Sequence, residues 1–280
     1  MIVNLIDENI AHANSYDETL EKGRVPNKIS YVKMLSEFDG ITIFTGRMTQ
    51  HIGRVNTKHN VAWIMEPRAF EPHSYRILEQ IGHKYDLILT HDKQILDLYP
   101  ETAVSIPADG IFVDTQAIYE EQNKSKNCSH IYSDKKILEG HRLRHDIAYQ
   151  IKSAGYDVDF YGKGCNPIER KADALLPYRF SISVENNRAT NYHTEKILDC
   201  FACRTIPVYW GDPSIFNYFD SNGIILFEST SDLMDILPNL DNNLYEKMRP
   251  AIEKNYQKCL DYYSIDNIVA EILERKFSLA

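Results

Sequence analysis

The sequence lacks the long apolar runs that mark a membrane protein. No stretch approaches the roughly 18 consecutive apolar residues of a membrane-spanning helix, and the N-terminal residues show no basic segment followed by an apolar one. We therefore predict no integral membrane segment and a cytoplasmic location. Basic residues are also in the minority, because 31 Lys and Arg stand against 40 Asp and Glu for a formal net charge of −9. Such a charge repels phosphate backbones, so nucleic acid is not an expected partner.

Cysteine is scarce as well. The five cysteines are an odd number scattered along the chain, which indicates reduced thiols and excludes a disulfide scaffold. Cys200 and Cys203 form the one closely spaced pair, but a zinc site needs a second pair and none occurs at a suitable spacing. We interpret the pair as helix packing.

The composition that remains is that of an ordinary globular protein, with 280 residues, 43% hydrophobic and 25% charged. Short β-branched runs alternate with helical patterns, which is typical of α/β architecture with parallel sheets. In the first half the predicted strands are 2–6, 41–45, 61–65, 86–90 and 103–106, and the predicted helices are 29–38, 74–83 and 93–99. In the second half the predicted strands are 129–133, 157–161, 180–184, 206–210 and 224–227, and the predicted helices are 140–154, 194–203 and 231–237. Residues 243–277 are predicted to be helical with an interruption around Ser264.

A polar segment at 120–127 contains no apolar residue and separates the two halves. The length also favours two lobes. We therefore predict an N-terminal α/β domain at 1–125 and a C-terminal α/β domain with the final helices at 126–280. Two such lobes would face each other across a cleft, and ligands of open parallel sheets bind beyond the carboxyl ends of the strands.

One motif lies at such a strand-to-helix junction. Asn191-Tyr-His-Thr-Glu-Lys196 follows a predicted strand and precedes a helix with a regular apolar stripe. Thr194 is a plausible N-cap for that helix. The free N–H groups of a helix N-terminus, with Lys196 beside them, suit a diphosphate. The local pattern alone is equally that of a surface helix start.

The flanking residues resemble a known signature. Tyr178-Arg-Phe-Ser-Ile-Ser-Val-Glu-Asn186, Tyr192-His-Thr-Glu-Lys196 and Ile206-Pro-Val-Tyr-Trp-Gly211 are similar, in letters and in spacing, to the donor-binding segments of glycosyltransferase family 10, the α1,3/4-fucosyltransferases. The resemblance implies a GT-B-like fold of two Rossmann-type α/β domains and GDP-fucose as the donor substrate. It also implies that a Glu at position 195 holds the ribose hydroxyls and a Lys at 196 a phosphate.

An upstream segment extends the resemblance. Lys135 and then Arg144, near the start of a predicted helix, look like the family's Lys and its diphosphate arginine, with Arg142 as the alternative. A guanidinium pairs with phosphate oxygens at two points and so suits a departing diphosphate. The donor-binding residues that we predict are Lys135, Arg144, Glu185, Asn186, Tyr192, Thr194, Glu195 and Lys196.

A carboxylate in the first half is the candidate catalytic base. Val61-Ala-Trp-Ile-Met-Glu66-Pro67 resembles the family's segment that ends in the catalytic Glu, except that the Ser between Glu and Pro is missing. Glu71-Pro72 repeats the dipeptide five residues later, so Glu71 is the alternative base. A carboxylate at a strand end can be desolvated until its pKa suits proton abstraction.

No metal or other cofactor is predicted. Asp157-Val-Asp159 has the D-x-D form of metal-dependent glycosyltransferases, but the resemblance implies a metal-independent enzyme, and we interpret the pair as structural. His141 and His145 stand at i and i+4 without a third ligand. Gly162-Lys-Gly164 lacks the third glycine of a dinucleotide fingerprint.

Taken with the resemblance, these residues predict an inverting transfer of fucose from GDP-fucose to a glycan hydroxyl, with Glu66, Arg144 and Lys196 as the catalytic residues. Two other readings stay open: a glycosyltransferase with another nucleotide sugar, and a non-catalytic module that binds a sugar nucleotide or glycan. The sequence gives no indication of the acceptor, the linkage or the oligomeric state.

Overall fold

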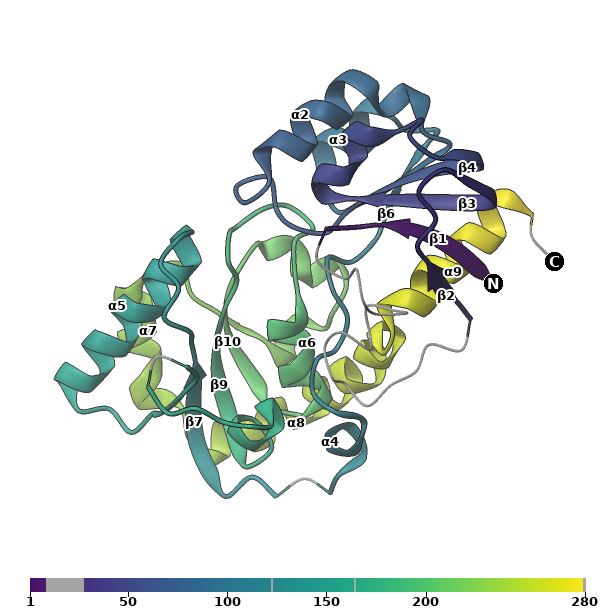
Figure 1. The fold of residues 1–280 in the computed structure, drawn as a ribbon. Helices are drawn as coiled ribbons and strands as arrows, with labels where there is room; N and C mark the ends of the chain where they lie inside the picture. Colours follow the sequence, from purple (N-terminus) through teal and green to yellow (C-terminus); the bar gives the residue numbers. More distant parts are fainter. Residues whose placement is uncertain (9–27, 122, 164, 279–280) are drawn as a thin grey trace. The chain divides into compact units, whose positions relative to one another are not determined.

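The computed structural model describes residues 1–8, 28–121, 123–163 and 165–278, which form two α/β units (Figure 1). Unit 1 comprises Met1–Gly110, Ala189–Tyr192 and Ser264–Ala280, and unit 2 comprises Ile111–Arg188 and His193–Tyr263. This division differs from the predicted one: the border lies at Gly110 rather than at residue 125, and the last helix belongs with unit 1. Within the described part of the chain, none of the helices combines the length and the apolar character needed to cross a membrane.

The sheet of unit 1 is parallel throughout its described strands, in the order β2-β1-β3-β4-β5-β6. Its strands are β1 (Ile2–Ile6), β2 (Ser30–Val32), β3 (Glu37–Thr45), β4 (Asn56–Ile64), β5 (Leu87–Thr90) and β6 (Ala103–Ser105). Side chains alternate between the two faces of a strand, and β4 illustrates it. Val61 and Trp63 belong to the core on one face, while Ala62 and Ile64 belong to the core on the other.

Helices cover both faces of this sheet. The helices α2 (Pro72–Ile81) and α3 (Lys93–Leu98) contribute to the core that contains Ile64, whereas α9 (Ile265–Phe277) contributes to the core that contains Trp63 (Figure 1). Pro72 begins α2, where its missing N–H costs nothing. Ser264 caps α9 by accepting a hydrogen bond from the backbone N–H of Asn267, which explains the predicted interruption there.

The predicted helix at 29–38 is wrong. Residues 30–32 form the edge strand β2, paired with β1, and β3 begins at Glu37. Ile29 and Tyr31 are buried while Ser30 between them is exposed, which is the period of a strand rather than that of a helix.

The sheet of unit 2 is also parallel in its described strands, in the order β11-β10-β9-β7-β8. Its strands are β7 (Lys126–Ile131), β8 (Asp159–Tyr161), β9 (Tyr178–Val184), β10 (Ile206–Trp210) and β11 (Ile225–Leu226). All five lie at or beside a predicted strand, but β7 starts at Lys126, inside the segment that we predicted as linker, because Lys126 pairs with Tyr178 of β9.

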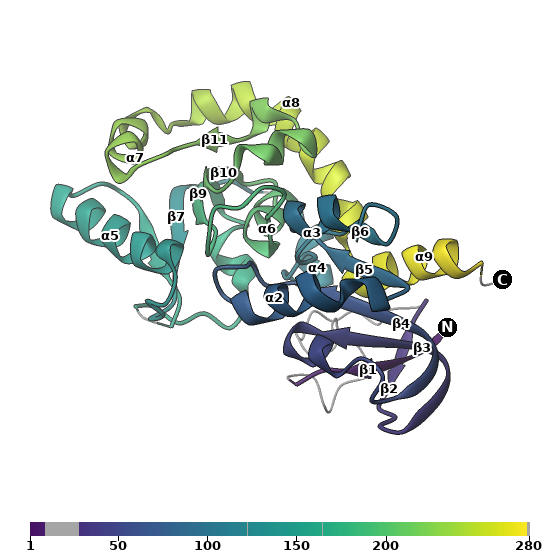
Figure 2. The same ribbon diagram turned by 90° about the horizontal axis from the view of Figure 1, so that it is seen from above.

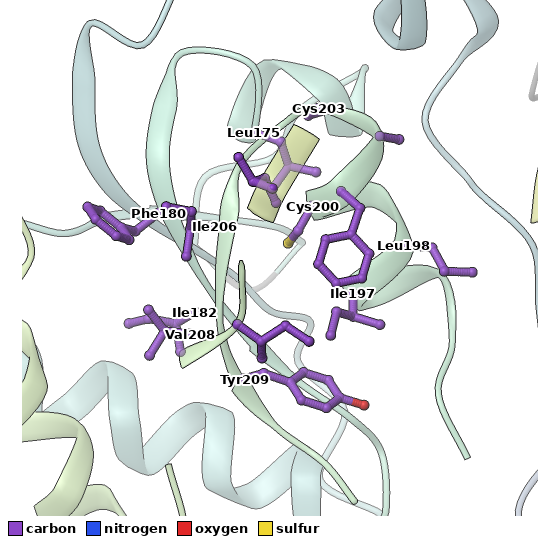
Figure 3. Close-up of a cluster of buried hydrophobic side chains, with 14 of the residues drawn as sticks. Leu175, Phe180, Ile182, Ile197, Leu198, Cys200, Cys203, Ile206, Val208 and Tyr209 are labelled. Atoms are coloured by element: carbon purple, nitrogen blue, oxygen red, sulfur yellow. The ribbon is translucent and has the colours of Figure 1, made fainter. Parts of the chain in front are cut away.

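The helices of unit 2 pack on this sheet through one large apolar core. They are α4 (Thr115–Tyr119), which the sequence reasoning missed, α5 (Glu139–Ala154), α6 (Glu195–Ala202), α7 (Thr230–Ile236) and α8 (Asn242–Cys259). In two views of the molecule α5 lies beside α7, and the Tyr156 hydroxyl donates to the Met234 carbonyl between these segments (Figures 1 and 2). Figure 3 shows Ile197 of α6 on the side of the helix that faces the labelled side chains of β9 and β10, and Leu198 belongs to the same core. This packing places the N-terminus of α6 at the carboxyl end of β9.

Candidate functional site

The candidate site of unit 2 is built on the turn that joins β9 to α6. Glu185 follows the last residue of β9 and is fully buried. Its carboxylate accepts two hydrogen bonds from Thr194, from the backbone N–H at 2.9 Å and from the hydroxyl at 2.8 Å, and a third from the Tyr209 hydroxyl at 3.3 Å. The buried carboxylate therefore ties the N-cap of α6 to the end of β9.

Two charged side chains begin α6. The Lys196 ammonium lies 3.1 Å from Oε1 of Glu195 and 3.6 Å from Oε2 of Glu185, and it donates to the Thr194 hydroxyl at 2.9 Å. Burial alone would raise the pKa of Glu195, but Lys196 and Lys171 outweigh it and lower that pKa to about 2. Glu195 is therefore an anion throughout the physiological range, and it can accept hydrogen bonds from hydroxyl groups.

Arg144 reaches the same strand end from α5. Its side chain is buried, and its guanidinium donates to the Val184 carbonyl at 3.0 Å and to Oδ1 of Asn186 at 2.9 Å. The close approach depends on Gly140 in the first turn of α5, because a Cβ there would lie 1.7 Å from the Glu185 carbonyl oxygen. Arg142 is exposed and donates instead to the Ile137 carbonyl at 3.0 Å. Of the two candidate arginines, the fold brings Arg144 to the site.

A pocket of 300 Å³ lies beside these groups within unit 2. Arg144, Glu195 and Lys196 line it, and its other walls are mostly apolar. It opens at the carboxyl ends of β7 and β9, where parallel α/β sheets bind ligands. These groups suit a nucleoside diphosphate. The cations can bind its phosphates, the anionic Glu can accept hydrogen bonds from its ribose hydroxyls, and the apolar wall can contact its base. The residues that line the pocket are Ile131, Tyr132, Ser133, Arg144, Gly162, Lys163, Lys171, Leu175, Ser181, Ile182, Ser183, Val184, Glu195, Lys196 and Cys200.

The other predicted donor residues have different surroundings. Glu185, Asn186 and Thr194 hold the lining residues by hydrogen bonds, as described above. Lys135 is exposed, and its ammonium helps to lower the pKa of nearby His141 to about 4, after burial and Arg144. Tyr192 is counted with unit 1, where its ring lies 5.0 Å from that of His91. The donor roles of all these residues stay predictions.

Lys171 is the clearest lining residue that the sequence reasoning missed. It begins a short 3-10 turn (Lys171–Ala174) and lies 2.6 Å from Asp199 and 3.7 Å from Glu195. The available signal was Asp199, a charged residue inside the otherwise apolar stripe of α6. A buried carboxylate calls for a basic partner, but the sequence does not say which of the 31 Lys and Arg residues supplies it.

The two candidate bases both lie in unit 1. Glu66 comes two residues after β4 and is half-buried, and its carbonyl accepts a hydrogen bond from the Tyr75 hydroxyl at 2.8 Å. Glu71 is the N-cap residue of α2, and its Oε2 accepts a hydrogen bond from Ser74 at 3.1 Å. Gly46 has a φ of +44° and leaves space for the Glu71 carboxylate, whose oxygens would lie 3.0 and 3.1 Å from a Cβ.

Burial raises the pKa of Glu71, and the neighbouring carboxylates Glu8 and Asp7 add to the effect against Ser74 and Arg47. A carboxylate with a raised pKa binds a proton more readily than an exposed one, which is a property of a general base. Unit 1 therefore offers two carboxylates at the carboxyl edge of its sheet, and the choice between Glu66 and Glu71 stays open.

The motifs that we interpreted as structural make contacts within the chain. Asp159 accepts a hydrogen bond from Tyr178 and pairs with Lys126 at 2.9 Å, and these two contacts lower its pKa. Cys200 and Cys203 are free thiols in the core, as the packing interpretation predicts. Gly164 of the Gly162-Lys-Gly164 motif lies outside the described residues. In the part of the chain that is described, no group of three or more His, Cys, Asp or Glu side chains could hold a metal ion.

The parallel sheets and the pocket at their strand ends define a GT-B glycosyltransferase fold. A crystal structure of an α1,3-fucosyltransferase with GDP superposes with a TM-score of 0.60 at 18% identity, covering 98% of this chain and 89% of that one. In sequence, residues 121–250 match the model of "Glycosyltransferase family 10 (fucosyltransferase) C-term". Over these residues the chain is similar to glycosyltransferase family 10, in agreement with the resemblance in the sequence.

Two curated relatives share shorter stretches. "Putative fucosyltransferase R654" of Acanthamoeba polyphaga mimivirus is 28% identical over an alignment of 140 residues, and the match covers 43% of this chain and 22% of that protein. "Alpha-(1,3)-fucosyltransferase FucT" of Helicobacter pylori is 36% identical over 58 residues, which are 21% of this chain and 12% of that protein. The matched regions thus span less than a quarter of either relative.

Proposed function

We propose that the chain is an inverting fucosyltransferase that transfers fucose from GDP-fucose to a hydroxyl of a glycan, in the manner of an α1,3-fucosyltransferase. The observation that carries the proposal is the arrangement of Arg144, Glu195 and Lys196 around one 300 Å³ pocket. It is the arrangement of charges that a nucleoside diphosphate requires. The family supports fucose as the sugar, and a solved α1,3-fucosyltransferase of the same fold holds GDP-fucose.

In the proposed mechanism, Glu66 removes the proton of the acceptor hydroxyl as that oxygen attacks the anomeric carbon. GDP leaves from the opposite face of the sugar, so the configuration inverts. The transition state resembles an oxocarbenium ion, as in other glycosyl transfers. Arg144 and Lys196 stabilise the charge that develops on the departing diphosphate. Glu195 accepts hydrogen bonds from the ribose hydroxyls.

Two further proposals concern the surroundings of the enzyme. The acceptor is a glycan rather than a nucleic acid, which fits the acidic net charge of −9. The chain acts in the cytoplasm, where its five free cysteines would stay reduced.

Nucleotide binding tests the donor assignment. The melting temperature is measured with GDP, UDP, ADP, CMP and dTDP, each with and without EDTA. A nucleotide at 100 times its Kd stabilises by about 2.7 kcal/mol, which moves the midpoint by several degrees. We expect a shift with GDP that EDTA leaves unchanged and that Lys196→Ala reduces. A shift with UDP or dTDP alone would refute the assignment to GDP-fucose.

Transfer itself is then measured with GDP-fucose and a panel of glycans. We expect GDP release that depends on the acceptor and a fucosylated product with inverted anomeric configuration. Binding of GDP without transfer to any acceptor would favour a non-catalytic module that binds the sugar nucleotide.

A further inference from the structure

Lys171 joins two carboxylates of α6 at the wall of the pocket. Its ammonium lies 2.6 Å from Oδ2 of Asp199 and 3.7 Å from Oε1 of Glu195. The side chain is 27% exposed and belongs to the pocket lining. Glu195 and Asp199 are four residues apart and therefore share one face of the helix, so one ammonium can reach both.

Asp199 anchors this arrangement. It is fully buried, and its Oδ1 accepts hydrogen bonds from the backbone N–H groups of Phe112 at 2.6 Å and of Val113 at 3.0 Å. An ionised carboxylate in such a place needs a cation, and Lys171 is that cation. The Lys171 ammonium also lies 5.7 Å from the centre of the Phe112 ring. These contacts leave the Lys171 side chain little freedom.

Glu195 is thereby held from two sides. Lys196 lies 3.1 Å from it and Lys171 lies 3.7 Å from it. Lys196 is the next residue on the same helix. Lys171 lies on the 3-10 turn before β9, and its ammonium forms a salt bridge with the fully buried Asp199. A carboxylate between two ammonium groups is kept ionised and has a restricted orientation.

We infer that Lys171 is a positioning residue, which orients the Glu195 carboxylate toward the ribose hydroxyls of the bound nucleotide. The inference rests on the proposed donor site. Asp199 already balances the charge of Lys171 at 2.6 Å, so Lys171 acts mainly through Glu195 and adds little attraction for the diphosphate.

The test compares two ligands that differ only in the ribose. The Kd values of GDP and of 2′,3′-dideoxy-GDP are measured by titration calorimetry for the wild type and for Lys171→Gln. Glutamine can still donate to Asp199 but carries no charge. We expect the wild type to prefer GDP by about tenfold, since hydrogen bonds to a charged group are strong. Lys171→Gln should reduce this preference to about twofold or less and leave the Kd of dideoxy-GDP nearly unchanged.

Three variants complete the experiment. Glu195→Gln should also lose the preference for GDP, and Lys171→Gln combined with Glu195→Gln should lose no more than either one alone. Lys126→Gln is the matched control, because it removes another Lys–Asp pair of unit 2, at 2.9 Å, away from the pocket lining. It should keep the wild-type preference. If Lys171→Gln does not fold, Lys171→Gln combined with Asp199→Asn replaces it, because the second change removes the buried charge that would otherwise lack a cation, and melting curves establish folding.

The outcomes separate the inference from the proposed function. If Lys171→Gln weakens both ligands equally, or keeps the wild-type preference, the positioning role is refuted while GDP binding stands. If the wild type binds neither ligand, the proposed donor site fails first.

Discussion

At the scale of single residues, the choice between the two carboxylates of unit 1 gives the sharpest prediction. We expect Glu66→Gln to lower the rate of fucose transfer by at least about a hundredfold, because a general base typically contributes that much. The Kd for GDP should not change, because the predicted donor site lies in unit 2. Rates are measured with the best acceptor of a glycan panel, and Kd by calorimetry.

Glu71→Gln is the matched control for this prediction, since it removes a second carboxylate of unit 1 by the same isosteric change. We expect it to retain most of the activity. The reverse result, a silent Glu66→Gln and an inactive Glu71→Gln, would transfer the role of base to Glu71, whose pKa burial already raises.

Residue identity could be predicted from the sequence only where a motif carried it. The Thr194-Glu-Lys196 segment predicted a charged helix start, and the structure has α6 begin there with Thr194 as its N-cap. The resemblance favoured Arg144 and kept Arg142 as the alternative, and only the packing of α5 on β9 shows which of the two side chains is buried. The role of Lys171 could not be predicted from the sequence, because its partner Asp199 is 28 positions later and only the fold brings the two together.

At the scale of elements, the N-cap of α6 makes a prediction about stability. Thr194→Ala removes both the cap and the hydroxyl that donates to the buried Glu185 at 2.8 Å. Loss of a cap costs about 1 kcal/mol, and loss of a hydrogen bond to a buried charge adds about 1 to 2 kcal/mol. We expect unfolding of unit 2 at a lower urea concentration.

Ser229→Ala is the control, because Ser229 caps α7 at an exposed position without a buried carboxylate. Ser229→Ala should lower the free energy of unfolding by only about 1 kcal/mol. Equal losses for the two variants would mean that the Glu185 contact adds nothing to stability.

Strong periodicity made most elements predictable, and weak periodicity produced the errors. The apolar stripe of α6 and the β-branched run of β10 were assigned closely. Residues 30–32 were assigned to a helix because a strand of three residues is too short to show alternation, and its pairing with β1 is a contact across more than 20 residues. The helix α4 is only five residues long, and its signal was the N-cap Asp114.

At the scale of the whole molecule, chain connectivity is what the sequence could not predict. The helix α9 completes a core of unit 1 with Val269, Ala270 and Leu273, although it directly follows unit 2 in the sequence. Its apolar stripe fits any parallel sheet with an uncovered face. Only the three-dimensional contacts show which sheet it covers.

Both units contain buried histidines, which predict that the protein loses stability in mild acid. Burial lowers the pKa of His91 in unit 1 to about 4, against an opposing effect of Asp92. Burial likewise lowers the pKa of His130 in unit 2 to about 4, although the carbonyls of Ile182 and Arg144 oppose it. His141 behaves in the same way, for reasons given above.

The sign follows from the two states. In the unfolded state a histidine has a pKa of about 6.5, so as the pH falls the unfolded state binds a proton before the folded state does. The contribution of the neutral histidine to the free energy of unfolding is therefore fully present above about pH 6.5 and declines as the pH falls toward 4. Each of these histidines contributes up to about 1.4 kcal/mol per pH unit in that window. Carboxylates such as Glu195, with its pKa lowered to about 2, lose their contribution only at lower pH.

The variant His91→Phe isolates one of these groups. Phenylalanine keeps a ring against Tyr192 and cannot take a proton, and the replaced Nδ1 has no hydrogen-bond partner among the described residues. We expect unit 1 of the variant to lose less stability than the wild type between about pH 7.5 and pH 5, by urea unfolding at each pH. His83→Phe, at an exposed position, should keep the wild-type dependence. An unchanged slope in His91→Phe would show that His91 is not a source of the acid sensitivity.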